Sequence, residues 1–274
     1  MLKQGQRDRV EVVLVSPRNP LNIGAVARAM ANFSFSRLTV VAPYEPHWRE
    51  ARSAVGAPEL LQSAREAATL GEAVADCTFV AGTGTRTHRK PEQTVMVLPD
   101  AAPVFAHQLD RGGRAAVVFG PEKHGLTRED LSYCHALIEI PTDPRQPSMN
   151  LGQAVAVCLY ELGRSVEWAP AEQSAMEIHG LPPSRQEKVA KMGHGGLEAE
   201  PGAPSGELDR LAGLIEETMV AAGYSPRAMQ PANRHDLRVA LRRLSPSGLD
   251  TRRMMGLFRR ILYRLQHRAN RVRS

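Results

Sequence analysis

Short apolar, β-branched runs alternate with stretches of helical periodicity between residues 10 and 168. The apolar runs are typical of buried parallel strands and comprise Val10–Val15, Leu38–Ala42, Thr78–Ala81, Ala115–Phe119 and Leu137–Ile140. The stretches between them are predicted helices, namely Asn22–Asn32, Pro58–Thr69, Ala101–Leu109, Thr127–Cys134 and Ser148–Gly163. This alternation indicates an α/β domain with a mostly parallel sheet.

The remainder of the chain divides into a polar segment and a helical segment. Residues 170–206 are rich in Pro, Gly, Ser and Glu and show no sustained apolar period, which predicts a partly disordered linker. Three amphipathic stretches follow at Glu207–Ala222, Asn233–Leu244 and Leu249–Arg271. We therefore expect an α/β domain over residues 1–168, a linker over 169–206 and a helical extension over 207–274.

Positive charge is concentrated in the helical extension. Residues 207–274 contain 14 Arg and no Lys against 6 acidic residues, a net charge of +8, so a chain of net charge +6 carries −2 elsewhere. At about 100° per residue, one side of the last helix is apolar, with Met254, Phe258, Ile261, Leu262 and Leu265. The other side carries Arg253, Arg260, Arg264, Arg268 and Arg271. Such a helix can bind a polyanion or a membrane surface, or form a solvated surface.

Cysteine usage and the N-terminus indicate a cytoplasmic protein. Cys77, Cys134 and Cys158 are far apart and form no CxxC pair, which argues against a disulfide framework or a zinc site. The first apolar run, Val10–Val15, is too short for a signal peptide or a membrane span. We expect a reducing compartment and no metal.

Unusual residues gather in the loops that leave the predicted strands. In parallel α/β sheets, ligands bind where loops leave the carboxyl ends of the strands. Three such loops are Gly82–Arg86, Gly120–Gly125 and Pro141–Pro147. No GxGxxG follows the first strand, which weakens the case for an ordinary dinucleotide-binding enzyme.

The segment after the first strand combines a helix start with one arginine. Asn22 is expected to cap the helix, and Arg28 lies away from the apolar stripe. Gly24 in the first turn weakens a helix, which indicates a close approach by another chain or a ligand. A capped helix with a solvated arginine explains the same residues.

Two further motifs have similar dual explanations. In Phe119–Leu126, two glycines permit close backbone approach to a flat ligand and Glu122 offers an acceptor, although a tight strand-to-helix connection has the same features. In Ser148–Asn150, polar residues open a helix whose next turn is small, and a helix N-terminus favours electron-rich groups. Ser148 as a plain N-cap is the alternative.

In this order and spacing, the three motifs resemble those of the SPOUT superfamily of RNA methyltransferases, in its SpoU/TrmH branch. The matching signatures are N-x-G-x-x-x-R at Asn22–Arg28, F-G-x-E-x-x-G-L at Phe119–Leu126 and S-x-N at Ser148–Asn150. The likeness covers Val10 to Gly163. Glu207–Leu211 and Arg242–Leu244 are similar to the helical extension of the TrmJ subgroup, which methylates the tRNA anticodon loop.

The resemblance implies a trefoil-knotted α/β domain with a small, all-helical C-terminal domain. It also implies a homodimer in which both subunits contribute to each site, and S-adenosylmethionine as the methyl donor. Carried over position by position, the cofactor-binding residues would be Thr83, Gly84, Thr85, Gly120, Ile140, Pro147, Ser148 and Met149.

The implied activity is methylation of an RNA ribose 2′-oxygen, with cytidine or uridine at tRNA anticodon-loop position 32 as the expected target. The catalytic residues would be Arg28 with Asn22, Glu122, Ser148 and Asn150 in support. Because guanidinium groups stay protonated in proteins, we expect Arg28 to clamp a phosphate and polarise the ribose oxygen.

The expected RNA contacts are Arg28, Arg86, Arg253, Arg260 and Arg264. A methyltransferase domain favours RNA over a membrane as the partner of the basic tail. Two alternatives remain: a 2′-O-methyltransferase of ribosomal RNA or another tRNA position, and a non-catalytic RNA-binding protein of the same fold.

Overall fold

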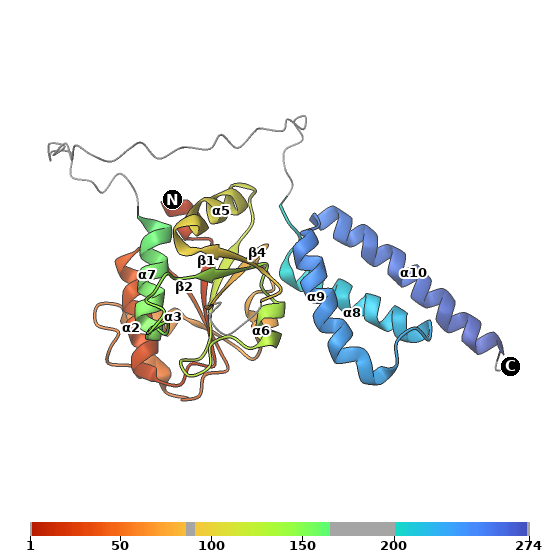
Figure 1. Ribbon diagram of the computed structural model, residues 1–274, viewed down its shortest axis with the longest axis horizontal. Coiled ribbons are helices and arrows are strands. Elements are labelled where there is room, and N and C mark those ends of the chain that lie inside the picture. The colour runs from red at the N-terminus through yellow and green to blue at the C-terminus, as the bar shows by residue number, and fades with distance from the viewer. Residues whose placement is uncertain (1, 86–90, 165–200, 273–274) are drawn as a thin grey trace.

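A seven-stranded sheet forms the centre of the first domain (Figure 1) in the computed structural model, which describes residues 2–85, 91–164 and 201–272. Its strands are β1 (Val10–Val15), β2 (Arg37–Val41), β3 (Arg65–Ala67), β4 (Phe79–Thr83), β5 (Thr94–Val97), β6 (Ala115–Phe119) and β7 (Ala136–Glu139). They lie in the order β3-β2-β1-β6-β4-β7-β5, and each neighbouring pair is parallel. The predicted parallel α/β sheet is therefore confirmed, and the trefoil knot stays a prediction.

Helices cover both faces of the sheet, because alternate residues of a strand point to opposite sides. Val12 and Leu14 of β1 pack on one side with the helices α2 (Pro20–Asn32), α3 (Pro58–Ser63), α5 (Leu98–Asp110) and α7 (Leu151–Gly163). Val13 and Val15 pack on the other side with α4 (Leu70–Ala73) and α6 (Arg128–Ser132). The short helices α1 (Gln4–Arg7) and η1 (Trp48–Glu50) complete this domain.

Sequence periodicity missed three elements at or near the edges of the sheet. The predicted helix Pro58–Thr69 is wrong beyond Ser63, because β3 and α4 follow. Strands β3 and β5 are the two edges of the sheet, and neither is fully buried. An edge strand packs on fewer neighbours, so it does not require a continuous apolar run.

The C-terminal extension is a three-helix unit of α8 (Ser205–Ala221), α9 (Gln230–Leu244) and α10 (Gly248–Val272), with η3 (Arg227–Met229) between the first two. Leu211, Ala212, Leu241 and Met255 form its core. The predicted linker lies outside the described residues except for residues 201–206. There, Gly202 forms a β-bridge with Ser247, and α8 starts two residues before the expected boundary. No helix among the described residues is long and apolar enough to span a membrane.

Arginines of α9 attach the extension to the first domain. Arg238 pairs with Glu129 of α6, and its guanidinium lies 4.3 Å from the centre of the Tyr133 ring. Arg242 is 1% exposed and bonds Ser205 Oγ at 2.7 Å and Asp209 Oδ1 at 3.1 Å. Arg238 therefore joins the two domains through an ion pair and a cation–π contact, whereas the hydrogen bonds of Arg242 to α8 lie within the C-terminal extension.

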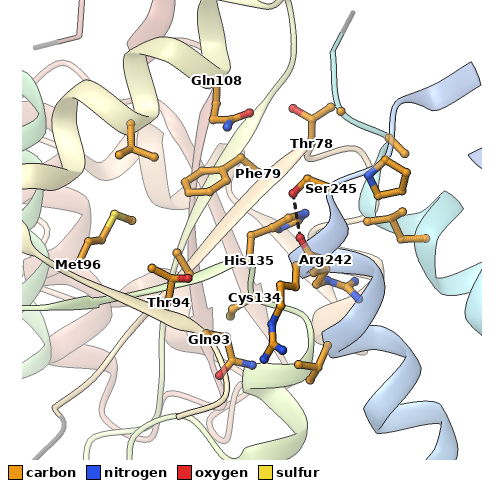
Figure 2. A pocket seen from close by; sticks show the side chains of 18 of the residues that line it. Thr78, Phe79, Gln93, Thr94, Met96, Gln108, Cys134, His135, Arg242 and Ser245 are labelled. Carbon is orange, nitrogen blue, oxygen red and sulfur yellow. Dashed lines mark hydrogen bonds between the residues drawn. The ribbon is translucent and has the colours of Figure 1, made fainter. Parts of the chain in front are cut away.

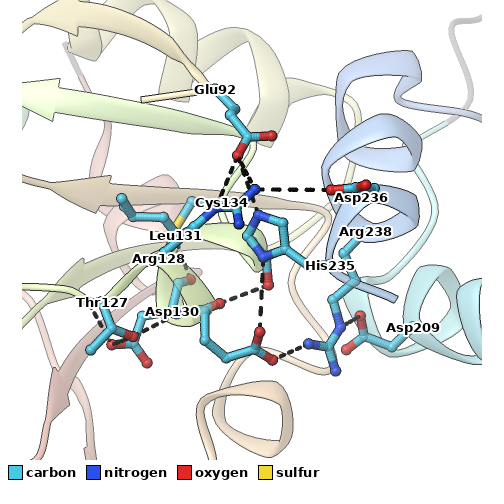
Figure 3. A network of polar contacts seen from close by, with 12 residues as sticks. Glu92, Thr127, Arg128, Asp130, Leu131, Cys134, Asp209, His235, Asp236 and Arg238 are labelled. Atoms are coloured by element: carbon cyan, nitrogen blue, oxygen red, sulfur yellow. Dashed lines mark hydrogen bonds and ion pairs between the residues drawn. The ribbon is translucent and has the colours of Figure 1, made fainter. Parts of the chain in front are cut away.

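A cluster of carboxylates beside His235 belongs to the same seam. Glu92, His235 and Asp236 place ligand-type atoms within 4.8 Å of one another. Arg128 lies among them, 2.8 Å from Glu92 and 4.0 Å from Asp236 (Figure 3). The guanidinium group supplies positive charge at this position, so the cluster has a structural explanation without a metal.

Candidate active site

A cavity of about 320 Å³ opens at the carboxyl ends of β4, β6 and β7. This volume lies at the lower end of the range for small-molecule sites, about 300 to 1,000 Å³. All eight residues predicted to bind the cofactor line the cavity: Thr83, Gly84, Thr85, Gly120, Ile140, Pro147, Ser148 and Met149. Three loops far apart in the sequence thus form one pocket.

Backbone atoms form part of the cavity wall where the loop after β6 turns back on itself. A Cβ atom added to Gly120 would lie 2.2 Å from the Leu126 nitrogen and 2.3 Å from the Gly125 carbonyl carbon. Gly125 has a φ of +63°, a conformation that side-chain-bearing residues rarely adopt. Both glycines are therefore required by the shape of this loop, as the alternative of a tight strand-to-helix connection predicted.

Side chains from the three motifs form one hydrogen-bonded chain beside the cavity. Asn22 Nδ2 donates to Glu122 Oε1 at 2.8 Å, and Asn150 Nδ2 donates to Asn22 Oδ1 at 2.9 Å. The Asn22 side chain thus donates its N–H to the motif that contains Glu122 and accepts with its oxygen from the motif that contains Asn150. Residues that are 100 and 128 positions apart in sequence are held in contact by this one side chain.

Glu122 is held as a carboxylate. Burial alone would raise its pKa, but hydrogen bonds from Asn22 and from the backbone N–H groups of Arg18 and Asn19 outweigh that effect. The pKa of Glu122 therefore lies below its ordinary value, because each donor stabilises the charged form. Glu122 can orient donors and attract positive charge, and it is a poor proton acceptor at neutral pH.

The structure corrects the expected cap of α2 and excludes the alternative that Ser148 is a plain N-cap of α7. Asn19, not Asn22, caps α2 by accepting from the Leu21 N–H at 2.9 Å, and Pro20 takes the first helical position. The Asn19-Pro20 pair is a helix-start signal that the sequence contains. Asn150, not Ser148, caps α7 by accepting from the N–H groups of Gly152 and Gln153, so Ser148 is left in the cavity wall.

Gly24 has a structural explanation within its own chain. A Cβ atom at this position would lie 2.2 Å from Ser53 Oγ and 2.8 Å from the Ala54 nitrogen. The close approach predicted at Gly24 is therefore made by the segment around Ser53 and Ala54. No second chain or ligand is needed to account for it.

Arg28 is not part of the cavity wall or of the hydrogen-bonded chain formed by Asn22, Glu122 and Asn150. It is exposed on α2, and it does not line the cavity of its own chain. Arg86 lies outside the described residues. Arg253, Arg260 and Arg264 are exposed on α10 in the C-terminal unit.

A second cavity of about 320 Å³ lies between the sheet domain and the C-terminal unit (Figure 2). Thr78, Phe79, His135 and Arg242 are in its wall, and none of the predicted site residues is. The Val80 N–H donates to His135 Nδ1 at 3.1 Å. Burial and the nearby Arg242 charge lower the pKa of His135 to about 3, so this imidazole is neutral at physiological pH.

The model of the SpoU rRNA Methylase family matches residues 9–160, which include all three motifs and both sides of the first cavity. The chain belongs to this family. The match ends before the C-terminal unit, which begins at α8. The predicted membership of the SpoU branch is confirmed.

This SpoU methylase is similar to proteins named TrmJ, and the similarity to some of them covers most of its length. It is 34% identical over 260 residues, 94% of each chain, to the tRNA (cytidine/uridine/adenosine-2′-O-)-methyltransferase TrmJ of Pseudomonas aeruginosa. It is 37% identical over 155 residues to the tRNA (cytidine-2′-O-)-methyltransferase TrmJ of Methanocaldococcus jannaschii, which covers 56% of this chain and 66% of that protein. The crystal structure of TrmJ from Z. mobilis ZM4 superposes with a TM-score of 0.72 at 30% identity, covering 92% of this chain and 98% of that one.

Proposed function

We propose that this SpoU methylase transfers a methyl group from S-adenosylmethionine to a ribose 2′-oxygen of tRNA, at cytidine or uridine 32 of the anticodon loop. The similarity to TrmJ proteins over 94% of the chain supports the substrate class. The observation that carries the proposal is the meeting of three motifs. Asn22 forms hydrogen bonds with both Glu122 and Asn150 beside a cavity lined by every predicted cofactor residue.

The cavity suits the chemistry of the donor molecule. Ile140, Leu151 and Ala154 offer apolar surface for a flat adenine ring. The ionised Glu122 in the same wall favours positively charged groups, such as an ammonium or a sulfonium. S-adenosylmethionine supplies an already activated methyl group, so the protein must mainly align the reactants and help remove the hydroxyl proton.

Arg28 is assigned to the ribose and phosphate rather than to the cofactor. A guanidinium group cannot act as a base near neutral pH, but it can donate two parallel hydrogen bonds to a phosphate and polarise a neighbouring hydroxyl. The proton then leaves through a phosphate oxygen or water. An exposed Arg28 is available for such a contact.

We further propose that the enzyme works as a homodimer in which Arg28 serves the cavity of the partner subunit. The position of Arg28 outside its own cavity wall supports this arrangement. Mixing Arg28→Ala with Glu122→Ala tests it, since a mixed dimer would contain one site with both native side chains. Recovery of activity on mixing supports shared sites, and no recovery above the two single variants contradicts them.

The C-terminal unit is proposed as an RNA contact through Arg253, Arg260 and Arg264. A membrane-surface helix inserts its apolar side into lipid, whereas Met254 and Phe258 of α10 pack into the core of the three-helix unit. The basic side remains for phosphates. A cytoplasmic location follows from this substrate.

Purified protein should transfer labelled methyl groups from S-adenosylmethionine to a tRNA transcript, and a 2′-deoxy substitution at position 32 should abolish the transfer. Loss of transfer only on deoxy substitution elsewhere would move the target to another tRNA position. Methyl transfer to ribosomal RNA but not to tRNA would identify the protein as a ribosomal RNA 2′-O-methyltransferase. Well-folded protein that binds RNA but shows no calorimetric uptake of S-adenosylmethionine would be a non-catalytic RNA-binding protein, and the proposal would be wrong.

A further inference from the structure

The outward side of α10 carries a compact group of cationic and aromatic side chains. Thr251 and Met255 are buried on its inner side, and Met254 and Phe258 pack on the same core. Arg260, Tyr263, Arg264 and His267 recur at the spacing i, i+3, i+4 and i+7, which places them on one stripe. All four are exposed.

Two of these side chains form an exposed aromatic stack. The ring centres of Tyr263 and His267 are 3.8 Å apart, and their planes meet at 30°. His267 Nδ1 lies 2.8 Å from the Tyr263 carbonyl oxygen. Because a carbonyl oxygen only accepts, Nδ1 must carry the hydrogen, and this bond holds the imidazole in place. Tyr263 remains 60% exposed, so the stack keeps open aromatic surface toward solvent.

The charge beside the stack is not neutralised within the protein. Across the described part of the chain, no ion pair joins Arg260 or Arg264 to an acidic side chain, whereas Arg253 lies 3.6 Å from Asp250. Two free guanidinium groups one helical turn apart attract an anionic chain. Aromatic rings beside such groups offer a surface for the flat face of a nucleobase.

We propose that Tyr263 and His267 form a stacking platform for one unpaired base of an RNA loop, while Arg260 and Arg264 bind the flanking phosphates. This proposal rests on the proposed function for its substrate class and adds a preference within it. Arginines alone bind duplex and loop alike, since both present phosphates. A stacking platform accepts only a base that is free of its helical neighbours, so the surface should favour a hairpin loop over a duplex.

The test compares two labelled RNAs by fluorescence anisotropy with the full-length protein: a hairpin with a seven-nucleotide loop, and a blunt duplex with the same number of phosphates. Base–aromatic stacking is strong enough that Tyr263→Ala should weaken hairpin binding about tenfold. Duplex binding should stay unchanged, and Tyr263→Phe, which keeps the ring, should bind the hairpin like the wild type. Tyr224→Ala is the matched control, because Tyr224 is 79% exposed in the same unit.

A double variant with Arg260→Gln and Arg264→Gln should bind both the hairpin and the duplex more weakly. It should also reduce the slope of log affinity against log salt by about 1.4, since each phosphate contact on a single strand contributes about 0.7. Unchanged hairpin binding in Tyr263→Ala, or equal weakening of hairpin and duplex, would overturn the platform.

Methyl transfer measured at saturating tRNA separates this proposal from the proposed function. If the protein transfers methyl groups but Tyr263→Ala binds both RNAs as tightly as the wild type, the stacking platform is wrong and the proposed function stands. If the protein shows no methyl transfer but prefers the hairpin through Tyr263, the proposed methyltransferase function is wrong and the stacking platform stands.

Discussion

Asn22 Nδ2 lies 2.8 Å from Glu122 Oε1, so helix α2 and the loop after β6 are joined by a hydrogen bond to a charged acceptor. The same Asn22 accepts from Asn150 at 2.9 Å. This side chain therefore determines how the three motifs sit relative to one another, and its loss should affect stability and cofactor binding together.

Asn22→Ala should destabilise the protein by about 1 kcal/mol at pH 7, the usual net value of such a hydrogen bond. Because the folded-state pKa of Glu122 is lowered, its contribution is present above the ordinary pKa of a glutamate and is lost as pH falls through the folded-state pKa. The difference between wild type and variant should therefore shrink below about pH 4.3. Urea unfolding of both proteins, at pH values from about 7 to below about 4.3, measures this difference in the free energy of unfolding. Asn32→Ala, at the exposed end of α2, should show no such difference.

Gly120→Ala should abolish binding of S-adenosylmethionine and cost about 2 kcal/mol or more of stability, because the new methyl group would overlap the backbone of Gly125 and Leu126. Calorimetry and thermal unfolding report the two effects separately. Gly5→Ala has open space around the added Cβ atom and serves as the matched control. A variant that binds the cofactor normally would mean that this loop does not form the pocket wall.

Arg28→Lys should lower the turnover number at least tenfold while the affinity for S-adenosylmethionine stays unchanged. Lysine keeps the positive charge and loses the planar fork that holds a phosphate through two bonds. Steady-state kinetics with saturating cofactor measure the effect, and the exposed Arg52→Lys is the control. Near-normal turnover in Arg28→Lys would show that charge alone suffices.

His135→Asn should make the protein more resistant to acid than the wild type. The pKa of His135 is about 3 in the folded state and near 6.5 in the unfolded state, so the unfolded chain binds the extra proton between these values. Wild-type stability therefore decreases as the pH falls below 6.5, by about 2.7 kcal/mol relative to the variant at pH 4.5. Asparagine keeps an acceptor for the Val80 N–H. If the two proteins lose the same amount of stability as the pH falls from about 6.5 to about 4.5, the lowered pKa of His135 is wrong.

Local patterns accounted for the central strands and for the loops beside the cavity, whereas the individual cofactor residues followed from the family resemblance. The predicted strands Val10–Val15 and Ala115–Phe119 coincide with β1 and β6, because a central strand packed on both faces requires a continuous apolar run. The glycines of the β6 loop were also recognisable, since the turn itself demands them. The family followed from the order and spacing of three short motifs, all of which lie within residues 9–160.

Only the tertiary structure decided which distant side chains meet. The hydrogen bonds of Asn22 span 100 and 128 residues, and no local period encodes such a pairing. Arg242 resembles its solvated neighbours in sequence, yet it is buried at the seam between the domains because Ser205 and Asp209 supply its acceptors. Sequence determines a residue's chemistry and its place on an element. Contacts between elements depend on how helices and sheet pack in three dimensions.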